Sequence, residues 1–259
     1  MALQTRVKIT KTADLGEGIH ELVFVCPPMA RAARPGQFIN VYCDDASRML
    51  PRPISICELP GDGQIRLVYR IVGAGTEEMA GKAPGDWLTV MGPLGNGYPS
   101  AGKKAVLLGG GVGIPPLLEL EKEIGIPAAA FLGYRSDQTF LLDDFRKYGA
   151  VYVSSDDGSI GVKGTVITAL ERAVADGFSL DGAVLYACGP APMLRGVKAF
   201  ALEHRLTAYI SLEERMACGI GACLGCVCRT TDVNGHSGVK NARVCKDGPV
   251  FEAREVDLS

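Results

Sequence analysis

The chain has 259 residues, of which 47% are hydrophobic and 22% charged, proportions typical of a globular protein with a substantial core. They exclude a disulfide-stapled miniprotein and a disordered chain. The formal net charge of −2 gives no general attraction to phosphate backbones, so we expect no nucleic-acid binding.

Residues 7–94 are organised as short apolar stretches separated by Gly/Pro turns. Such a series predicts an antiparallel barrel or sandwich, which we assign as a β-barrel. A short helical stretch, Thr76–Ala80, interrupts it. The predicted strands are Leu22–Cys26, Phe38–Cys43, Ile54–Leu59, Ile65–Val72 and Trp87–Met91.

After Lys104 strands alternate with helices, which indicates a Rossmann-like parallel α/β domain of three layers. The predicted strands are Ala105–Leu108, Ala128–Gly133, Val151–Ser154, Ala183–Cys188 and Ala208–Leu212. The predicted helices are Ile114–Ile124, Asp143–Tyr148, Val166–Ala175 and Pro192–His204. We therefore expect three domains: a barrel (1–100), an α/β domain (101–212) and a small cysteine-rich module (213–259).

Nine cysteines are present, and residues 1–8 lack the apolar core of a signal peptide. The longest apolar run, 105–118, is broken by glycines and prolines, so no membrane insertion is expected. We expect a cytoplasmic protein, where thiols stay free or bind metal.

Four of these cysteines predict a metal centre. Cys218, Cys223 and Cys226 follow a C-x4-C-x2-C pattern, and Cys245 is a distant fourth ligand. This is the spacing of plant-type [2Fe–2S] sites. The small residues between the thiols let the backbone fold tightly and direct N–H groups at sulfur. Cys228 closely follows the third ligand, Cys226, on an extended segment, and we treat it as a non-ligand.

Two alternatives to an iron–sulfur site remain open for these cysteines. A disulfide scheme is disfavoured by the compartment, and a structural zinc site would prefer two C-x2-C knuckles, of which one is present. The remaining thiols stand apart in strand-like surroundings and are expected in the core; they are Cys26, Cys43, Cys57 and Cys188.

Two glycine turns in the α/β domain predict a dinucleotide site. One contains Gly110, Gly111 and Gly113, and the other contains Cys188, Gly189 and Pro190. Both join a strand end to a helix start, where ligands bind in open α/β sheets. Asp156 and Asp157 follow a third strand, and their carboxylates would repel the 2′-phosphate of NADP, which favours NAD over NADP as the ligand. Each turn is also consistent with a tight strand–helix connection alone.

The barrel carries a second set of candidates. Arg52-Pro53-Ile54-Ser55 begins a strand, and Tyr69-Arg70-Ile71 ends one before the helix start at Gly75-Thr76. Either arginine is suited to bind a pyrophosphate, helped by N–H groups at the helix start, and Tyr69 to stack on an aromatic ring. Exposed strand arginines and a turn glycine are the ordinary alternative.

Taken together, R-P-x-S, Y-R-I-V-G-x-G-T, G-G-G-V-G-I-P-P and C-G-P-x-P-M resemble the ferredoxin–NADP reductase superfamily over residues 5–212. With C-G-I-G-A-C-x-G-C-V-C, the chain resembles the electron-transfer subunits of class 1B dihydroorotate dehydrogenases. The resemblance implies FAD, NAD and a [2Fe–2S] cluster. It places Arg52–Ser55 and Tyr69–Ile71 along the flavin, Gly75 and Thr76 at its pyrophosphate, and the four cysteines on the cluster.

The cofactors imply the chemistry, because FAD accepts a hydride pair and passes single electrons to a cluster. No catalytic acid–base constellation is evident, and His20, His204 and His236 are scattered. The resemblance implies electron flow from an FMN-containing catalytic subunit to NAD+ in pyrimidine biosynthesis, in a heterotetramer of two plus two. The alternative is a small subunit of an NAD(P)H:ferredoxin oxidoreductase or of a sulfide or hydrogenase complex. A purely structural iron–sulfur protein would not need the flavin and nucleotide motifs.

Overall fold

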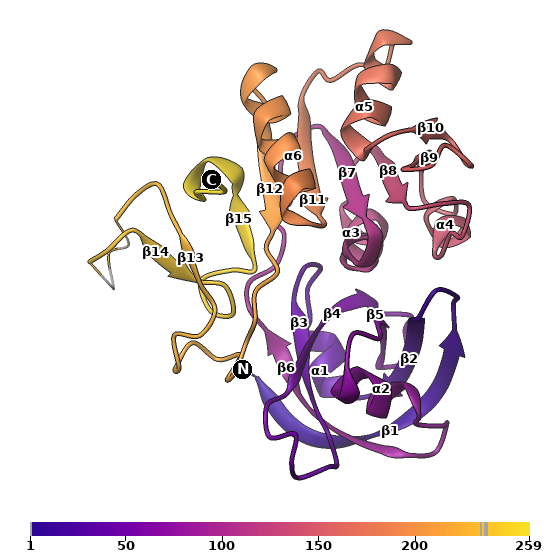
Figure 1. Ribbon diagram of the computed structural model, residues 1–259, viewed down its shortest axis with the longest axis vertical. Coiled ribbons are helices and arrows are strands. Elements are labelled where there is room, and N and C mark those ends of the chain that lie inside the picture. The colour runs from indigo at the N-terminus through magenta and orange to yellow at the C-terminus, as the bar shows by residue number, and fades with distance from the viewer. Residues whose placement is uncertain (1, 234, 236–237) are drawn as a thin grey trace.

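The computed structural model describes residues 2–233, 235 and 238–259. In its N-terminal third, six strands close into an antiparallel barrel in the order β1-β2-β5-β4-β3-β6 (Figure 1). Helices α1 and α2 lie in the connections. The bounds are β1 Leu3–Asp14, β2 Ile19–Val25, α1 Pro27–Ala32, β3 Phe38–Tyr42, β4 Arg52–Glu58, β5 Gln64–Arg70, α2 Ala74–Ala80 and β6 Trp87–Leu94.

Alternation of apolar residues explains the barrel. In β3, Ile39 and Val41 point into its core, while Phe38 belongs to a different hydrophobic cluster outside it. The sequence prediction missed β1, although the strand pairs with both β2 and β6 and closes the barrel. Val7 and Ile9 are its only two fully buried residues, so its apolar signal is weak.

The second part is a seven-stranded sheet in the order β10-β9-β8-β7-β11-β12-β15. Six strands are parallel, and β15 joins β12 antiparallel. Helices α5 and α6 pack on one face with Val106 and Leu108, and the opposite face packs against α3 and α4. The bounds are β7 Lys104–Gly110, α3 Leu118–Glu123, β8 Ala128–Tyr134, α4 Leu142–Phe145, β9 Ala150–Ser155, β10 Val162–Lys163, α5 Val166–Ala175, β11 Ala183–Cys188, α6 Ala191–Glu203, β12 Thr207–Ser211 and β15 Val250–Glu252. The predicted barrel and three-layer α/β classes are confirmed.

The predicted helix Ile114–Ile124 is wrong in its first half. Two 3-10 turns, Gly111–Gly113 and Pro115–Leu117, precede the short helix α3. The Ile114 N–H donates to the Gly111 carbonyl and the Leu117 N–H to the Ile114 carbonyl, each three residues back, which is the 3-10 pattern. The turn after β7 therefore presents 3-10 geometry to any ligand, not the N-terminus of a long helix.

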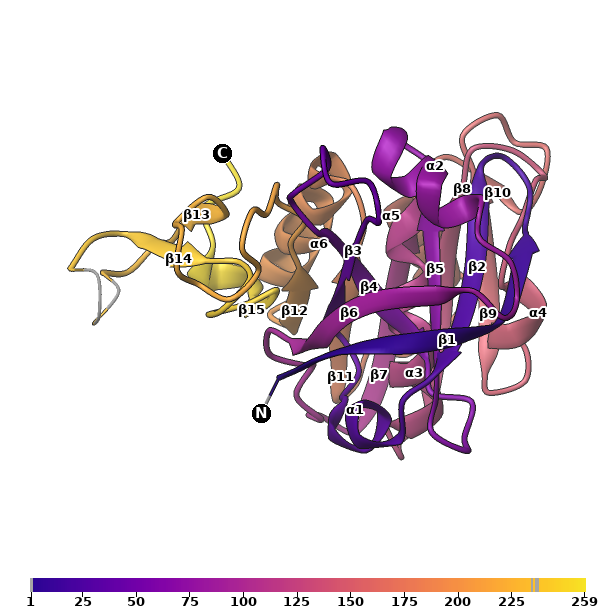
Figure 2. The same cartoon turned by 90° about the horizontal axis from the view of Figure 1, so that it is seen from below.

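The C-terminal segment projects to one side of the molecule and then returns to the sheet (Figure 2). It forms the small antiparallel pair β13 (Val227–Arg229) and β14 (Asn241–Arg243) before β15. Among the described residues, no helix is long and apolar enough to cross a membrane.

Candidate functional site

The four predicted cluster cysteines lie as two pairs. Cys218 interacts with Cys223 in the more open part of the loop, and Cys226 interacts with Cys245 in the buried part. Across the described chain, no three or more His, Cys, Asp or Glu side chains surround one metal position. A two-iron cluster takes four thiolates, so two neighbouring pairs fit its donor set.

Backbone N–H groups point at the sulfurs of this loop. Gly221 N–H donates to Cys245 Sγ at 3.1 Å, and Cys245 N–H donates to Cys226 Sγ at 3.4 Å. Burial alone would raise the pKa of Cys218, but N–H groups of Ile220, Cys223 and Ala222 and the Cys223 thiol lower it to about 6. Hydrogen bonds to sulfur are the means by which proteins stabilise thiolates and bound clusters.

A charged pair holds the two halves of the loop together. Arg243 contacts the Asp247 carboxylate twice, at 3.0 Å from Nε and 2.9 Å from Nη2, and its Nη1 donates to the Gly221 carbonyl at 3.3 Å. Gly221 is the residue whose N–H reaches Cys245. The guanidinium thus connects the segment of the fourth thiol to that of the first three, a role that no sequence motif indicated.

The remaining thiols lie away from these pairs. Cys228 is buried in β13 opposite Ala242, and burial raises the pKa of its thiol to about 11. Cys26 and Cys57 are buried, whereas Cys43 and Cys188 are half-buried. The treatment of Cys228 as a non-ligand remains a prediction that its place in a core strand supports.

The two glycine turns lie side by side at the ends of adjacent strands. Cys188 is paired with Gly109 across β11 and β7. A Cβ on Gly113 would overlap the Cys188 carbonyl, and one on Gly110 would meet Met193 Sδ at 2.6 Å. Gly113 is therefore required by backbone contact between the turns, whereas the flexible Met193 side chain beside Gly110 can move. Gly111, with φ +54°, has open space around its Cα and is the glycine that a ligand can approach.

The barrel candidates also meet. The Arg52 guanidinium lies directly against Gly75, where any Cβ would overlap it. Arg52 forms no ion pair with a carboxylate among the described residues, so its charge is available to an anion. Thr76 is engaged internally: its hydroxyl donates to the Gly73 carbonyl at 2.8 Å and accepts from the Val72 N–H at 2.9 Å. Thr76 thus shapes the turn in front of α2.

Burial along the candidate strands is uneven. Arg52, Pro53, Ile54 and Ser55 are all half-buried, although an ordinary strand buries every second residue. Arg70 and Ile71 are also half-buried, whereas Tyr69 is enclosed in the barrel core and burial raises the pKa of its hydroxyl. The start of β4 therefore offers an accessible surface. The Tyr69 ring is buried, so the structure gives no support to the prediction that it stacks on a ligand ring.

Most of the remaining predicted polar groups that the structure describes have local structural partners. Asp157 accepts hydrogen bonds from the Ser159 N–H and hydroxyl, at 2.9 and 2.6 Å, which lower the pKa of its carboxyl. Asp156 is exposed at the end of β9. His20 lies beside Tyr69 and His204 beside Phe200. His236 lies outside the described residues.

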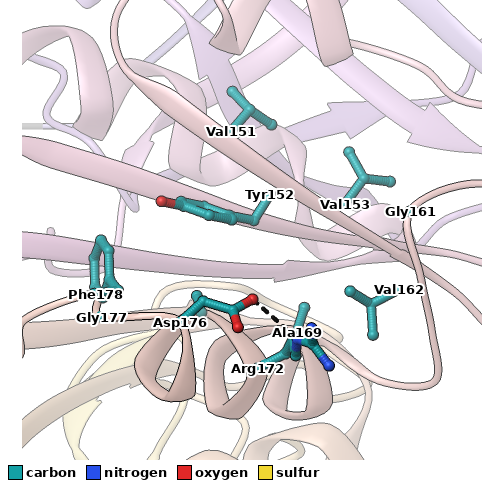
Figure 3. Close-up of a pocket in the computed structure, with 11 residues that line it drawn as sticks. Val151, Tyr152, Val153, Gly161, Val162, Ala169, Arg172, Asp176, Gly177 and Phe178 are labelled. Carbon is teal, nitrogen blue, oxygen red and sulfur yellow. Dashed lines mark hydrogen bonds and ion pairs between the residues drawn. The ribbon is translucent and has the colours of Figure 1, made fainter.

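A cavity of about 580 Å³ lies between β9, β10 and the second half of α5 (Figure 3). Tyr152 and Phe178 form its apolar wall, and the exposed pair Arg172–Asp176 lies at its edge. None of the predicted cofactor residues lines it. The candidates lie instead where β4 and β5 of the barrel pack against the turns after β7.

The barrel, the parallel sheet and these paired turns define the ferredoxin reductase class of fold. The chain superimposes on a ferredoxin NADP+ reductase from Neisseria gonorrhoeae with a TM-score of 0.64 at 14% identity, covering 77% of this chain and 91% of that one. It superimposes on NADH-dependent reduced ferredoxin-NADP oxidoreductase with a TM-score of 0.84 at 30% identity, covering 97% of this chain and 90% of that one.

Sequence comparison narrows this class. Residues 213–257 match the iron-sulfur cluster binding domain of dihydroorotate dehydrogenase B. The electron transfer subunit of dihydroorotate dehydrogenase B (NAD(+)) from Bacillus caldolyticus is 40% identical over 98% of both chains, and that from Enterococcus faecalis is 39% identical over the same shares. The chain therefore belongs to the family of dihydroorotate dehydrogenase B (NAD(+)) electron transfer subunits.

Proposed function

We propose that the chain passes electrons from an FMN-containing dihydroorotate dehydrogenase subunit to NAD+, in a heterotetramer of two plus two in the cytoplasm. One observation carries the proposal: β4, the accessible strand of the barrel, packs against the nucleotide turns, and its neighbour β3 contacts the cysteine segment. The three candidate sites therefore form one continuous row. When bound, FAD supplies the exchange between hydride and single electrons, and a [2Fe–2S] cluster supplies one-electron transfer.

The residues have separate tasks in this proposal. Cys218, Cys223, Cys226 and Cys245 hold the cluster, and the N–H groups around them stabilise the thiolates. Arg52 neutralises the flavin pyrophosphate beside Gly75, while Pro53, Ile54, Ser55, Tyr69, Arg70, Ile71 and Thr76 shape the flavin site. Gly110, Gly111 and Gly113, with Cys188, Gly189 and Pro190, receive NAD. In this proposal dihydroorotate is oxidised on the partner subunit, and this chain serves electron transfer.

The test is anaerobic formation of NADH from dihydroorotate and NAD+ by this chain mixed with an FMN-type catalytic subunit from the same source. We expect activity that requires both chains. Bound flavin and cluster without this activity would instead support a role like that of the NADH-dependent reduced ferredoxin-NADP oxidoreductase, with another redox partner.

Replacing Cys226, a buried thiol, with Ser separates the parts of the route. Cys226→Ser is expected to remove the cluster, because a serine hydroxyl binds cluster iron less well than a cysteine thiolate. Electron transfer to the partner should fall by at least about 100-fold. Reduction of FAD by NADH should persist. The matched control is Cys228→Ser, which should keep the cluster. Normal transfer to the partner in Cys226→Ser would show that electrons do not pass through these thiols.

A further inference from the structure

One barrel side chain contacts the cysteine segment beside its first thiol. Asn40 lies in β3, is fully buried, and donates from Nδ2 to the Cys218 carbonyl at 3.1 Å. Gly219, with φ +69°, lies against the same amide, and a Cβ there would overlap Nδ2. The chain thus uses a glycine in a left-handed conformation to let Asn40 reach the loop.

Asn40 also adjoins the accessible strand of the barrel. It is paired directly with Pro53 of β4, and directly paired residues of antiparallel strands point to the same face with Cβ atoms about 5 Å apart. Pro53 is one of the half-buried residues at the start of β4. Asn40 therefore contacts the loop that carries Cys218 and is also the cross-strand neighbour of Pro53 in β4, the strand of the flavin candidates.

The chemistry of Asn40 is unusual for a residue that only fills an interface. Its Oδ1 is buried and has no hydrogen-bond partner, which costs free energy that an apolar side chain of the same shape would avoid. By contrast, Asn96 has every amide atom in use: Nδ2 donates to the Asp247 and Val250 carbonyls, and Oδ1 accepts from the Val250 N–H. All amide atoms of Asn96 are therefore hydrogen-bonded, whereas Asn40 is held through its Nδ2 group and its buried Oδ1 has no partner.

We propose that Asn40 is a positioning residue that fixes the Cys218 loop against the flavin strand and thereby sets the rate of electron exchange between flavin and cluster. The inference rests on the proposed function. Electron exchange depends steeply on separation, and one hydrogen bond to the carbonyl of a ligand residue holds the loop at a defined distance from β4.

The test uses the full chain loaded with FAD and cluster, mixed anaerobically with NADH in a stopped-flow instrument. Flavin and cluster absorbance report hydride transfer and electron transfer separately. In Asn40→Leu we expect NADH to reduce the flavin at the wild-type rate and the flavin-to-cluster step to slow on the order of tenfold. Iron and sulfide content and the electron paramagnetic resonance signal of the dithionite-reduced cluster should stay unchanged.

Thr10→Val is the control, because it removes a hydrogen bond to the Val23 carbonyl between β1 and β2, outside the cysteine segment. It should leave the flavin-to-cluster rate unchanged. If Asn40→Leu does not load its cluster, Asn40→Ser, whose hydroxyl is too short to reach Cys218, should show the same slowing. A wild-type flavin-to-cluster rate in the loaded Asn40 variant would overturn the inference. Failure of NADH to reduce flavin or cluster in the wild-type chain would instead overturn the proposed function.

Discussion

At the scale of single residues, the chain contains a buried carboxylate that the proposed route does not use. Glu121 lies in α3 with both carboxylate oxygens buried and without a hydrogen-bond partner, and burial raises the pKa of its carboxyl to about 8. Its neighbour Glu119 also has a pKa raised by burial, to about 7, but accepts a hydrogen bond from the Leu59 N–H at 2.7 Å. The two residues therefore respond differently to substitution.

Glu121 should make stability depend on pH. Its ordinary pKa is 4.5, so between pH 4.5 and about 8 the folded state binds a proton that the unfolded state has lost. Stability is full below pH 4.5, falls as pH rises through this window, and then levels off. Glu121→Gln should therefore raise the free energy of unfolding at pH 9 by on the order of 1–3 kcal/mol, with little effect at pH 5.

Urea denaturation of both proteins at pH 5, 7 and 9 measures this difference. Glu119 contributes equally to both proteins, so it cancels in the comparison. Parallel stability profiles of the two proteins would show that the Glu121 carboxylate finds a partner in solution.

At the scale of elements, the sequence pattern predicted most strands and the helices with continuous periodicity. Helix Val166–Ala175 and strand Ala183–Cys188 have the predicted bounds. Strands with little apolar content were missed, including β1 and the two-residue β10. The prediction also missed β15, because pairing with β12 is decided by tertiary contact and leaves no local pattern.

The candidate site likewise contains some features that local sequence patterns predict and others that they do not. The cysteine spacing and glycine turns are local signals, and the structure brings the residues of each motif together. Arg243 and Asp247 are only four residues apart, but the contacts of Asn40 with Cys218 and of Arg243 with Gly221 join segments distant in the chain. Such contacts depend on the complete fold, so no spacing rule could have predicted them.

Strand β15 attaches the cysteine segment to the sheet, and Phe251 is its main anchor. The Phe251 ring packs against Gly248 and shares a hydrophobic cluster with Cys226 and Cys245. Phe251→Ala should cost about 3–5 kcal/mol and speed the loss of iron and sulfide on warming. Reduction of FAD by NADH should persist, because β4, β5 and the nucleotide turns contribute no residue to this hydrophobic cluster.

Val250→Ala provides the control, since Val250 lies in the same strand but packs in the cluster on the other face of the sheet. It should lower stability while the iron and sulfide content follows the wild type. Equal loss of iron from both variants would mean that strand stability alone, and not the Phe251 contact, retains the cluster.

At the scale of the whole molecule, a polar clamp joins the barrel to the sheet. Lys122 donates to the Leu59 carbonyl at 2.7 Å, while Glu119 accepts from the Leu59 N–H. Leu59 directly follows β4, and α3 directly follows the turns after β7. The clamp therefore links the strand of the flavin candidates to the segment of the nucleotide candidates. Arg66 adds a second link, bonded to Glu21 and Glu58 in the barrel and to Asp144 in α4.

Lys122→Met should loosen this link while keeping the apolar stem of the side chain. We expect the rate of flavin reduction by NADH to fall about tenfold, because hydride transfer requires close alignment of its two partners. Arg172→Gln removes an exposed ion pair of α5 and should leave the rate unchanged. Stopped-flow reduction under anaerobic conditions compares the variants, and a wild-type rate in Lys122→Met would exclude the clamp from setting this alignment.

The place of β15 in the sheet also matters for solubility. The cysteine segment is a long loop whose two ends are neighbouring strands, β12 and β15. If oxidation destroys the cluster and frees this segment, β12 becomes an unprotected edge with unpaired backbone groups, a template for pairing with another chain. Oxidative damage to one redox centre would then spread as aggregation, removing the subunit from its complex as well as interrupting its electron flow.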